Sequence, residues 1–181
     1  MLEWQLRIMN EKQFSDEIWK YLKESLKSHQ VSQGESLLYK LIIGADGKTK
    51  PEKTDLPSRG HYAFQTDILV KEKNIPLVVV ELKYGGFSTH DVLVYSTKAI
   101  KHKEIYSYLR YGLVVGGQDK IDGKFFIHNV GFDFALAIKN IEEKRRVLDS
   151  IVKNQIKIAK KLITILEKKP VSRYETEVKV D

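Results

Sequence analysis

The chain has 181 residues, enough to bury one substantial hydrophobic core but too few for two, so we expect a single domain over residues 1–170. Lysine and arginine number 31 against 24 acidic residues, and the resulting formal charge of +7 suits a polyanionic partner. Because there is no cysteine and the five histidines show neither HxH nor HExxH spacing, disulfides and thiolate metal sites are excluded, and zinc is not expected.

The two ends of the chain show no sequence pattern of a signal peptide or of a regular secondary structure. Residues 1–14 lack a basic segment followed by an apolar one, and no stretch of the sequence reaches the length that spans a bilayer. We therefore expect a cytoplasmic protein that does not enter a membrane. Residues 171–181, which follow Pro170, we expect to form a loose tail.

The first third of the sequence predicts one helix and leaves one segment open. Apolar residues recur at helical spacing over residues 15–28, with Ser15 as a suitable N-cap, which predicts a surface helix. Residues 32–44 are ambiguous. Ser32 and Glu35 have the spacing of a capping box, whereas the short apolar run that ends in a glycine would also suit a strand.

The middle third predicts a loop, a hairpin and a crossover. Residues 45–60 hold turn formers, charges and two prolines, and form a long loop of the kind that often contacts ligands. Residues 61–70 and 75–84 are rich in branched and aromatic side chains and flank a polar turn, which predicts a β-hairpin. A helix from a cap at Thr89 to about Arg110, then the apolar run YGLVVGG, predicts a parallel, right-handed crossover onto the same sheet.

The last third predicts one more strand and a long helix. FFIHNV reads as a strand, and the pattern from about Phe132 to Lys168 is helical, with an apolar stripe close to a heptad repeat. The fold class is therefore α/β, with a mixed sheet of four or five strands flanked by helices and a long C-terminal helix. The stripe can pack on its own domain or on a second copy of the chain, and we expect a homodimer.

The predicted hairpin gathers acidic and basic side chains at its end. Side chains alternate between the two faces of a strand, so one face of each arm carries a defined set: Gln65, Asp67 and Leu69 in the first arm, and Leu77, Val79, Glu81 and Lys83 in the second. If the register turns Glu81 and Lys83 towards Asp67, two carboxylates and an ammonium converge, and a divalent cation would offset their desolvation. Such a site suits phosphodiester hydrolysis, with Lys83 either orienting or deprotonating the attacking water.

These residues resemble a known nuclease motif. Asp67, thirteen intervening residues and then Glu81-Leu82-Lys83 on a hairpin, followed by a helix and a parallel strand, resemble the PD-(D/E)xK, or restriction endonuclease-like, superfamily over residues 60–117. The resemblance implies that Asp67, Glu81 and Lys83 are catalytic. It also implies that Asp67, Glu81 and the backbone carbonyl of Leu82 bind Mg²⁺, for which Mn²⁺ can substitute. Thr66 stands where the motif has its proline.

The resemblance implies supporting residues as well. Members of the superfamily often add a carboxylate from an earlier helix. Glu35 would fill that role if residues 32–44 are helical, and Glu17 or Glu24 would if they form the first strand; we favour Glu35. A polar or basic residue of the helix after the motif often supports the site, which makes Lys98 and His102 candidates.

Two groups of residues are candidates for contact with DNA. The helix after the motif carries a basic and aromatic stripe at spacings of four: Lys98, His102, Tyr106 and Arg110. A second group lies before Asp67, where its members would reach DNA backbone or base edges: Arg59, His61 and Gln65.

The function expected from these features is a Mg²⁺-dependent endonuclease that hydrolyses double-stranded DNA, resembling a type II restriction enzyme. The alternatives are a Holliday-junction resolvase or repair nuclease, and a nucleic-acid-binding protein that keeps the fold without cleavage. An intact set of Asp67, Glu81 and Lys83 favours catalysis over the binding protein.

Overall fold

The computed structural model describes residues 9–54, 57–58, 60–168, 170 and 172. At its centre is a mixed five-stranded sheet with the strand order β1-β6-β7-β8-β9. Its strands are β1 (Gln30–Gln33), β6 (Ile68–Glu72), β7 (Ile75–Tyr84), β8 (Arg110–Gly116) and β9 (Phe134–Ile138). Strand β6 is antiparallel to both of its neighbours, β1 and β7, whereas β7, β8 and β9 run parallel to one another. The predicted hairpin and the parallel crossover after it are both confirmed.

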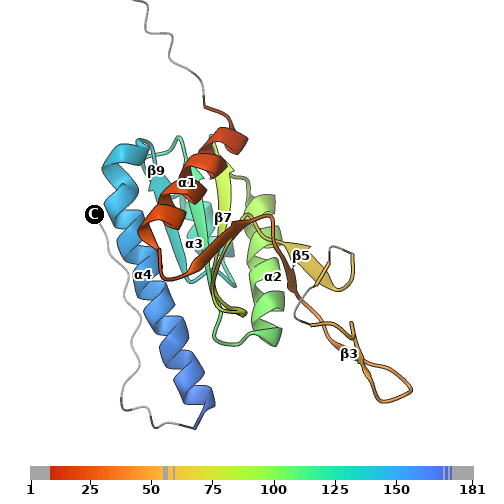
Figure 1. The fold of residues 1–181 in the computed structure, drawn as a ribbon. Helices are drawn as coiled ribbons and strands as arrows, with labels where there is room; N and C mark the ends of the chain where they lie inside the picture. Colours follow the sequence, from red (N-terminus) through yellow and green to blue (C-terminus); the bar gives the residue numbers. More distant parts are fainter. Residues whose placement is uncertain (1–8, 55–56, 59, 169, 171, 173–181) are drawn as a thin grey trace, which may run out of the picture.

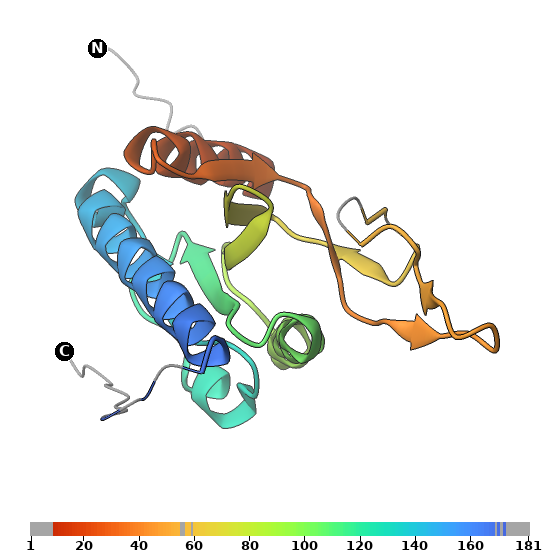
Figure 2. The ribbon, with the colours of Figure 1, turned by 60° about the horizontal axis from the view of Figure 1, so that its bottom comes forward.

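Helices cover both faces of this sheet, so the body has three layers (Figures 1 and 2). The helices are α1 (Glu11–Ser25), α2 (Thr89–Ile105), α3 (Gly123–His128) and α4 (Ile141–Leu166). Helices α1 and α4 pack on one face in a single buried cluster with β6 and β7. Helices α2 and α3 pack on the other face in a second cluster. The predicted mixed α/β architecture with a long C-terminal helix is thereby confirmed.

Strand β7 runs through the middle of the molecule. Six of its residues in succession, Leu77 to Leu82, are at most 2% exposed, because helices cover both of its faces. Burying each of the three valines contributes about 1.5–3 kcal/mol relative to exposing it. Glu81 is the one charged member of this run, so it enters the interior within a strongly stabilised strand.

Side-chain caps fix where the helices begin. Asn10 and Gln13 form a capping box at α1, which therefore starts before the predicted cap, Ser15. Helix α2 is capped by Ser88 and Asp91. It ends at Ile105, earlier than the sequence predicts, because the chain must turn before it enters β8.

Two predictions in the last third are wrong. FFIHNV does not form a strand: its first four residues, Phe125–His128, belong to α3, whose first turn is capped by the carboxylate of Asp122. The only buried side chain of α3 is Phe125, so burial in this segment does not alternate from residue to residue as it would in a strand. Residues 134–138, predicted as helix, instead form β9, which completes the parallel ladder against β8. Helix α4 starts only after the cap at Asn140.

The ambiguous segment 32–44 is extended rather than helical. It contains the end of β1, then β2 (Ser36–Leu38) and β3 (Ile42–Ile43), with Gly34 at φ 66° between the first two. Strand β2 pairs with β5 (Ala63–Gln65), and β3 pairs with β4 (Thr49–Lys50). The predicted loop, residues 45–60, therefore contains one short strand, β4. The ribbon that β4 forms with β3 projects from the body in both views (Figures 1 and 2).

Helix α4 presents its apolar stripe to its own domain. The buried cluster that α4 shares with α1, β6 and β7 contains the four residues Leu148, Val152, Ile156 and Ala159. In the described part of the chain, no helix is both long enough and apolar enough to cross a membrane. The predicted tail, residues 171–181, lies outside the described residues except for Ser172.

Candidate active site

Asp67 lies where the chain passes from the β2–β5 ribbon to the main sheet. Ile68 pairs with Val80, so the residue before it stands beside Glu81 on the neighbouring strand. The Asp67 Oδ2 atom accepts a hydrogen bond from the Leu82 N–H at 2.8 Å. Asp67 is thus anchored to the backbone of β7 next to Glu81, as the sequence predicts.

Glu81 is buried to an unusual degree for a carboxylate, with 1% of its surface exposed. Its Oε1 atom forms an ion pair with Lys98 Nζ at 2.7 Å and accepts a hydrogen bond from the Tyr111 hydroxyl at 2.6 Å. Its Oε2 atom has no hydrogen-bond partner among the described residues. A buried carboxylate oxygen without a partner costs free energy, so this atom is a candidate ligand position.

The electrostatics of Glu81 follow from this environment. Burial raises the pKa of Glu81 to about 7, Lys98 acts in the opposite direction, and the charge of Asp67 raises it further. The Asp67 effect requires that the two carboxylates lie close together. A divalent cation between them would remove that repulsion.

The oxygen atoms near this point are of the type that Mg²⁺ prefers. In a strand, the N–H and C=O of one residue point to the same edge, so the Leu82 carbonyl faces the same edge as the N–H that binds Asp67. Asp67, Glu81 and Leu82 therefore offer two carboxylates and a carbonyl, which are hard oxygen donors. No cluster of three or more His, Cys, Asp or Glu side chains suited to a metal occurs within the described ranges. Mg²⁺ commonly keeps several waters, so two carboxylates are a sufficient protein contribution.

Lys83 lies on the α1 and α2 side of the site. Its Nζ atom is 3.9 Å from Glu11 and 3.8 Å from Asp91, both at the first turns of their helices. Burial lowers the pKa of Lys83, but Tyr95 and these two carboxylates outweigh that effect, and its pKa is raised overall. Lys83 is therefore held as an ammonium by Glu11, Asp91 and Tyr95, whereas in the described part of the chain the ammonium that pairs with Glu81 is that of Lys98.

Tyr95 and Tyr111 belong to the site and were not among the predicted residues. The Tyr95 ring lies between the two ammonium groups, 5.2 Å from Lys83 Nζ and 5.8 Å from Lys98 Nζ. Tyr111 is fully buried, and its hydroxyl is the only one that bonds Glu81 in the described chain. Tyr95 precedes Lys98 by three residues on α2, a helical spacing that pointed to a shared face. Tyr111 required the β7–β8 register, which the sequence does not specify.

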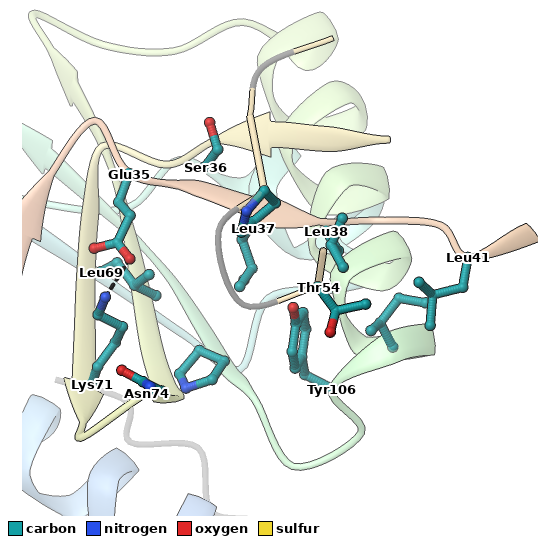
Figure 3. Close-up of a pocket in the computed structure, with 13 residues that line it drawn as sticks. Glu35, Ser36, Leu37, Leu38, Leu41, Thr54, Leu69, Lys71, Asn74 and Tyr106 are labelled. Carbon is teal, nitrogen blue, oxygen red and sulfur yellow. Dashed lines mark hydrogen bonds and ion pairs between the residues drawn. The ribbon is translucent and has the colours of Figure 1, made fainter. Parts of the chain in front are cut away.

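The structure does not bring Glu35 to Asp67 and Glu81. Its carboxylate forms an ion pair with Lys71 and accepts a hydrogen bond from Ser32. It lies at the edge of a separate pocket of about 340 Å³ beneath the β2–β5 ribbon, with its side chain turned to Lys71 (Figure 3). The helix that would have positioned Glu35 does not form.

The other early candidates also lie apart from the carboxylate pair. Glu17 and Glu24 are exposed on α1. The α1 carboxylate that reaches this region is Glu11, through Lys83. Sequence reasoning missed it because the predicted helix began at residue 15.

The three candidates for DNA contact that precede Asp67 differ in their surroundings. Arg59 lies outside the described residues. His61 is exposed and bonds Ser58 through Nδ1 at 2.8 Å. The Gln65 side chain donates to the Gly34 carbonyl at 2.9 Å, and the Gln65 carbonyl accepts from Lys98.

The predicted basic stripe on α2 does not form, because one of its residues is buried and two lie beyond the end of the helix. His102 is fully buried against the Leu37 carbonyl at 3.1 Å, and burial lowers its pKa to about 4, so it is a neutral core residue. Tyr106 caps the helix, and Arg110 opens β8 and pairs with Asp133. Of this stripe, only Lys98 lies at the carboxylate pair.

The chain matches no protein-family model, and comparison with curated proteins and with solved structures finds no significant match in either set.

Proposed function

We propose that this chain is a divalent-metal-dependent nuclease that hydrolyses DNA, built on a restriction endonuclease-like core of β6, β7, α2 and β8. The observation that carries the proposal is the pair Asp67 and Glu81, in which a buried carboxylate oxygen has no partner within the described residues. Structural ion pairs rarely leave such an atom unpartnered, whereas a metal ligand requires one. The net charge of +7 adds support for a polyanionic substrate.

Each side chain has a role in this proposal. Asp67, Glu81 and the Leu82 carbonyl would hold the cation, which supplies charge neutralisation at the phosphate and acidifies a bound water. The raised pKa of Lys83 keeps it protonated near neutral pH, so it acts as a hydrogen-bond donor to the phosphate or the water rather than as a base. Lys98 and Tyr111 fix Glu81 Oε1 and leave Oε2 directed to the ligand position.

Cleavage of plasmid and linear duplex DNA in Mg²⁺ tests the proposal. We expect nicked or cut DNA from the wild type, no product in EDTA, and a loss of at least a hundredfold in Asp67→Asn. Glu142→Gln, which neutralises an exposed carboxylate in the first turn of α4, is the matched control and should keep its rate. Inactivity of the wild type on several DNA substrates, in both Mg²⁺ and Mn²⁺, would contradict a general endonuclease.

The same assay separates the alternatives. Discrete fragments with one repeated end sequence favour a restriction-type enzyme. Preferential cutting of four-way junctions or damaged duplexes favours a resolvase or repair nuclease. Retention of DNA without cleavage, alongside absence of Mn²⁺ binding, favours the non-catalytic binding protein.

A further inference from the structure

The ribbon formed by β3 and β4 projects away from the three-layer body. Its register pairs Ile42 with Lys50 and Ile43 with Thr49, and its turn is closed by the Gly44 N–H on the Lys48 carbonyl at 2.9 Å. Both views show it extending beyond the β2–β5 ribbon, clear of the helices (Figures 1 and 2). We call residues 40–53 the ribbon arm.

The surface of the ribbon arm combines exposed lysines with an exposed apolar side chain, which favours binding to a polyanion. Ile43 is 75% exposed near its end, which nothing in the fold of the chain explains. Four lysines of the arm are exposed, against two acidic residues: Lys40, Lys48, Lys50 and Lys53 against Asp46 and Glu52. None of these lysines forms an ion pair with another described residue.

Aromatic and basic side chains lie between the ribbon arm and the candidate active site. At its base, the rings of Tyr39 and Phe64 stack at 4.0 Å. Phe64 then forms one wall of an open groove of about 540 Å³, whose other wall is the outer side of α2. Lys101 and Lys98 line this groove, and Lys98 also holds Glu81. The groove between Glu81 and the arm therefore combines Phe64 and two lysines with apolar residues of α2, Leu93 and Val94.

We infer that the ribbon arm binds the duplex DNA that is cut at Asp67 and Glu81, on one side of the scissile phosphate, by entering a groove of the double helix. This inference rests on the proposed function. The major groove admits a two-stranded β-ribbon, lysines contact phosphates without regard to sequence, and an exposed apolar side chain can meet a thymine methyl group or a base step. A second copy of the chain is a poorer partner, because it would bring another net charge of +7 against the lysines.

The length of the chain limits how far this contact extends. Strand spacing from Asp67 along β5 and then β2 to Gly44 gives a reach of at most about 34 Å, or about ten base pairs. DNA that extends less than this from the cut would lose contacts with the end of the arm. The contact should therefore appear on one side of the cut for each protein chain.

A triple variant tests the inference: Lys48→Ala, Lys50→Ala and Lys53→Ala. Its control removes the same charge from three exposed lysines, two on α1 and one just after it: Lys12→Ala, Lys20→Ala and Lys27→Ala. Binding of a fluorescent 40-base-pair duplex is measured by anisotropy in Ca²⁺ at several salt concentrations, and cleavage in Mg²⁺ is followed in parallel. All six lysines are exposed, so both variants should fold, which circular dichroism checks.

We expect the arm variant to bind DNA about 10- to 100-fold more weakly than the control near 0.1 M salt. Its salt dependence should be shallower by about 0.9 for each lost phosphate contact. Equal affinities and equal salt slopes in the two variants would overturn the inference, while wild-type cleavage in the same experiment would leave the proposed function standing. If the wild type neither binds nor cleaves DNA, both fail together.

Discussion

Burial of Glu81 makes the stability of the protein depend on pH in an unusual direction. Its pKa is about 7 in the folded chain, against 4.5 without burial, so the folded state binds the proton more tightly. Between these two values the folded state holds more protons than the unfolded state, and the free energy of unfolding falls as the pH rises. Below pH 4.5 both states are protonated, and above 7 both are ionised.

This titration predicts a difference between the wild type and Glu81→Gln. In EDTA, the free energy of unfolding of the wild type, relative to the variant, should fall by about 3 kcal/mol between pH 4.5 and pH 8. Urea denaturation at a series of pH values measures it. Parallel curves for the two proteins would show that Glu81 titrates normally, and would remove one of the two supports for a ligand position there.

Lys98 competes with a cation for the same carboxylate. It is 2.7 Å from Glu81 Oε1, so replacing its ammonium by an uncharged side chain removes a repulsion felt by any ion bound at Asp67 and Glu81. Lys98→Met should bind Mn²⁺ at least several-fold more tightly than the wild type in the absence of DNA, while cleaving more slowly. Lys101→Met, whose ammonium pairs with exposed Glu104, is the control and should bind Mn²⁺ as the wild type does. Weaker binding by Lys98→Met would mean that Lys98 organises the site rather than competing for it.

At the scale of elements, Asp133 joins α2, β8 and the start of β9. Its carboxylate accepts the Tyr111 N–H at 2.7 Å and pairs with Lys103 at 2.8 Å and with Arg110 at 3.0 Å. Only 11% of its side chain is exposed, so solvent would compensate little for its loss. It thereby anchors the strand that carries Tyr111 to Glu81.

Asp133→Ala should lower the free energy of unfolding by about 3–4 kcal/mol, since two cations and a backbone N–H lose a largely buried partner. Urea denaturation at pH 7 measures the change. Glu104→Ala, which breaks an exposed pair with Lys101, should stay within about 1 kcal/mol of the wild type. Similar small effects in both variants would show that the Asp133 cluster is a surface feature.

Elements that are specified by their own residue pattern could be predicted from the sequence, whereas elements that depend on pairing with a distant strand could not. The hairpin follows from two branched runs around a polar turn, and the crossover from its order along the chain. Strand β9 could not be separated from the helical pattern around it, because a short parallel strand is specified by its ladder to β8 rather than by its own alternation. The short helix α3 has one buried side chain, Phe125, and too little periodicity to indicate a helix.

The same distinction holds for the candidate site. Asp67, directly before β6, lies beside Glu81 of β7, as strand alternation predicts. The expected third member, Lys83, instead pairs with Glu11 and Asp91, and the ammonium that pairs with Glu81 is that of Lys98 from α2. Tyr111 was missed because its contact depends on register, and His102 was misassigned because periodicity places a residue on a face without saying whether that face is buried.

For the whole molecule, a basic chain places Asp67 and the buried Glu81 side by side at two inner strands of its sheet and carries a lysine-bearing ribbon on the segment that leads to Asp67. Both features are explained if one DNA duplex runs along the α2 groove from the carboxylate pair to the ribbon arm. The proposed function can therefore hold even if the arm does not contact DNA, whereas the role of the arm depends on the proposed function.

The most direct test of the central claim is a titration of the purified protein with Mn²⁺, followed by electron paramagnetic resonance at pH 8. We predict one bound ion per chain, with binding lost in Asp67→Asn and in Glu81→Gln but kept in Glu142→Gln. Absence of binding by the wild type, or binding that neither site variant weakens, would contradict a metal centre at Asp67 and Glu81.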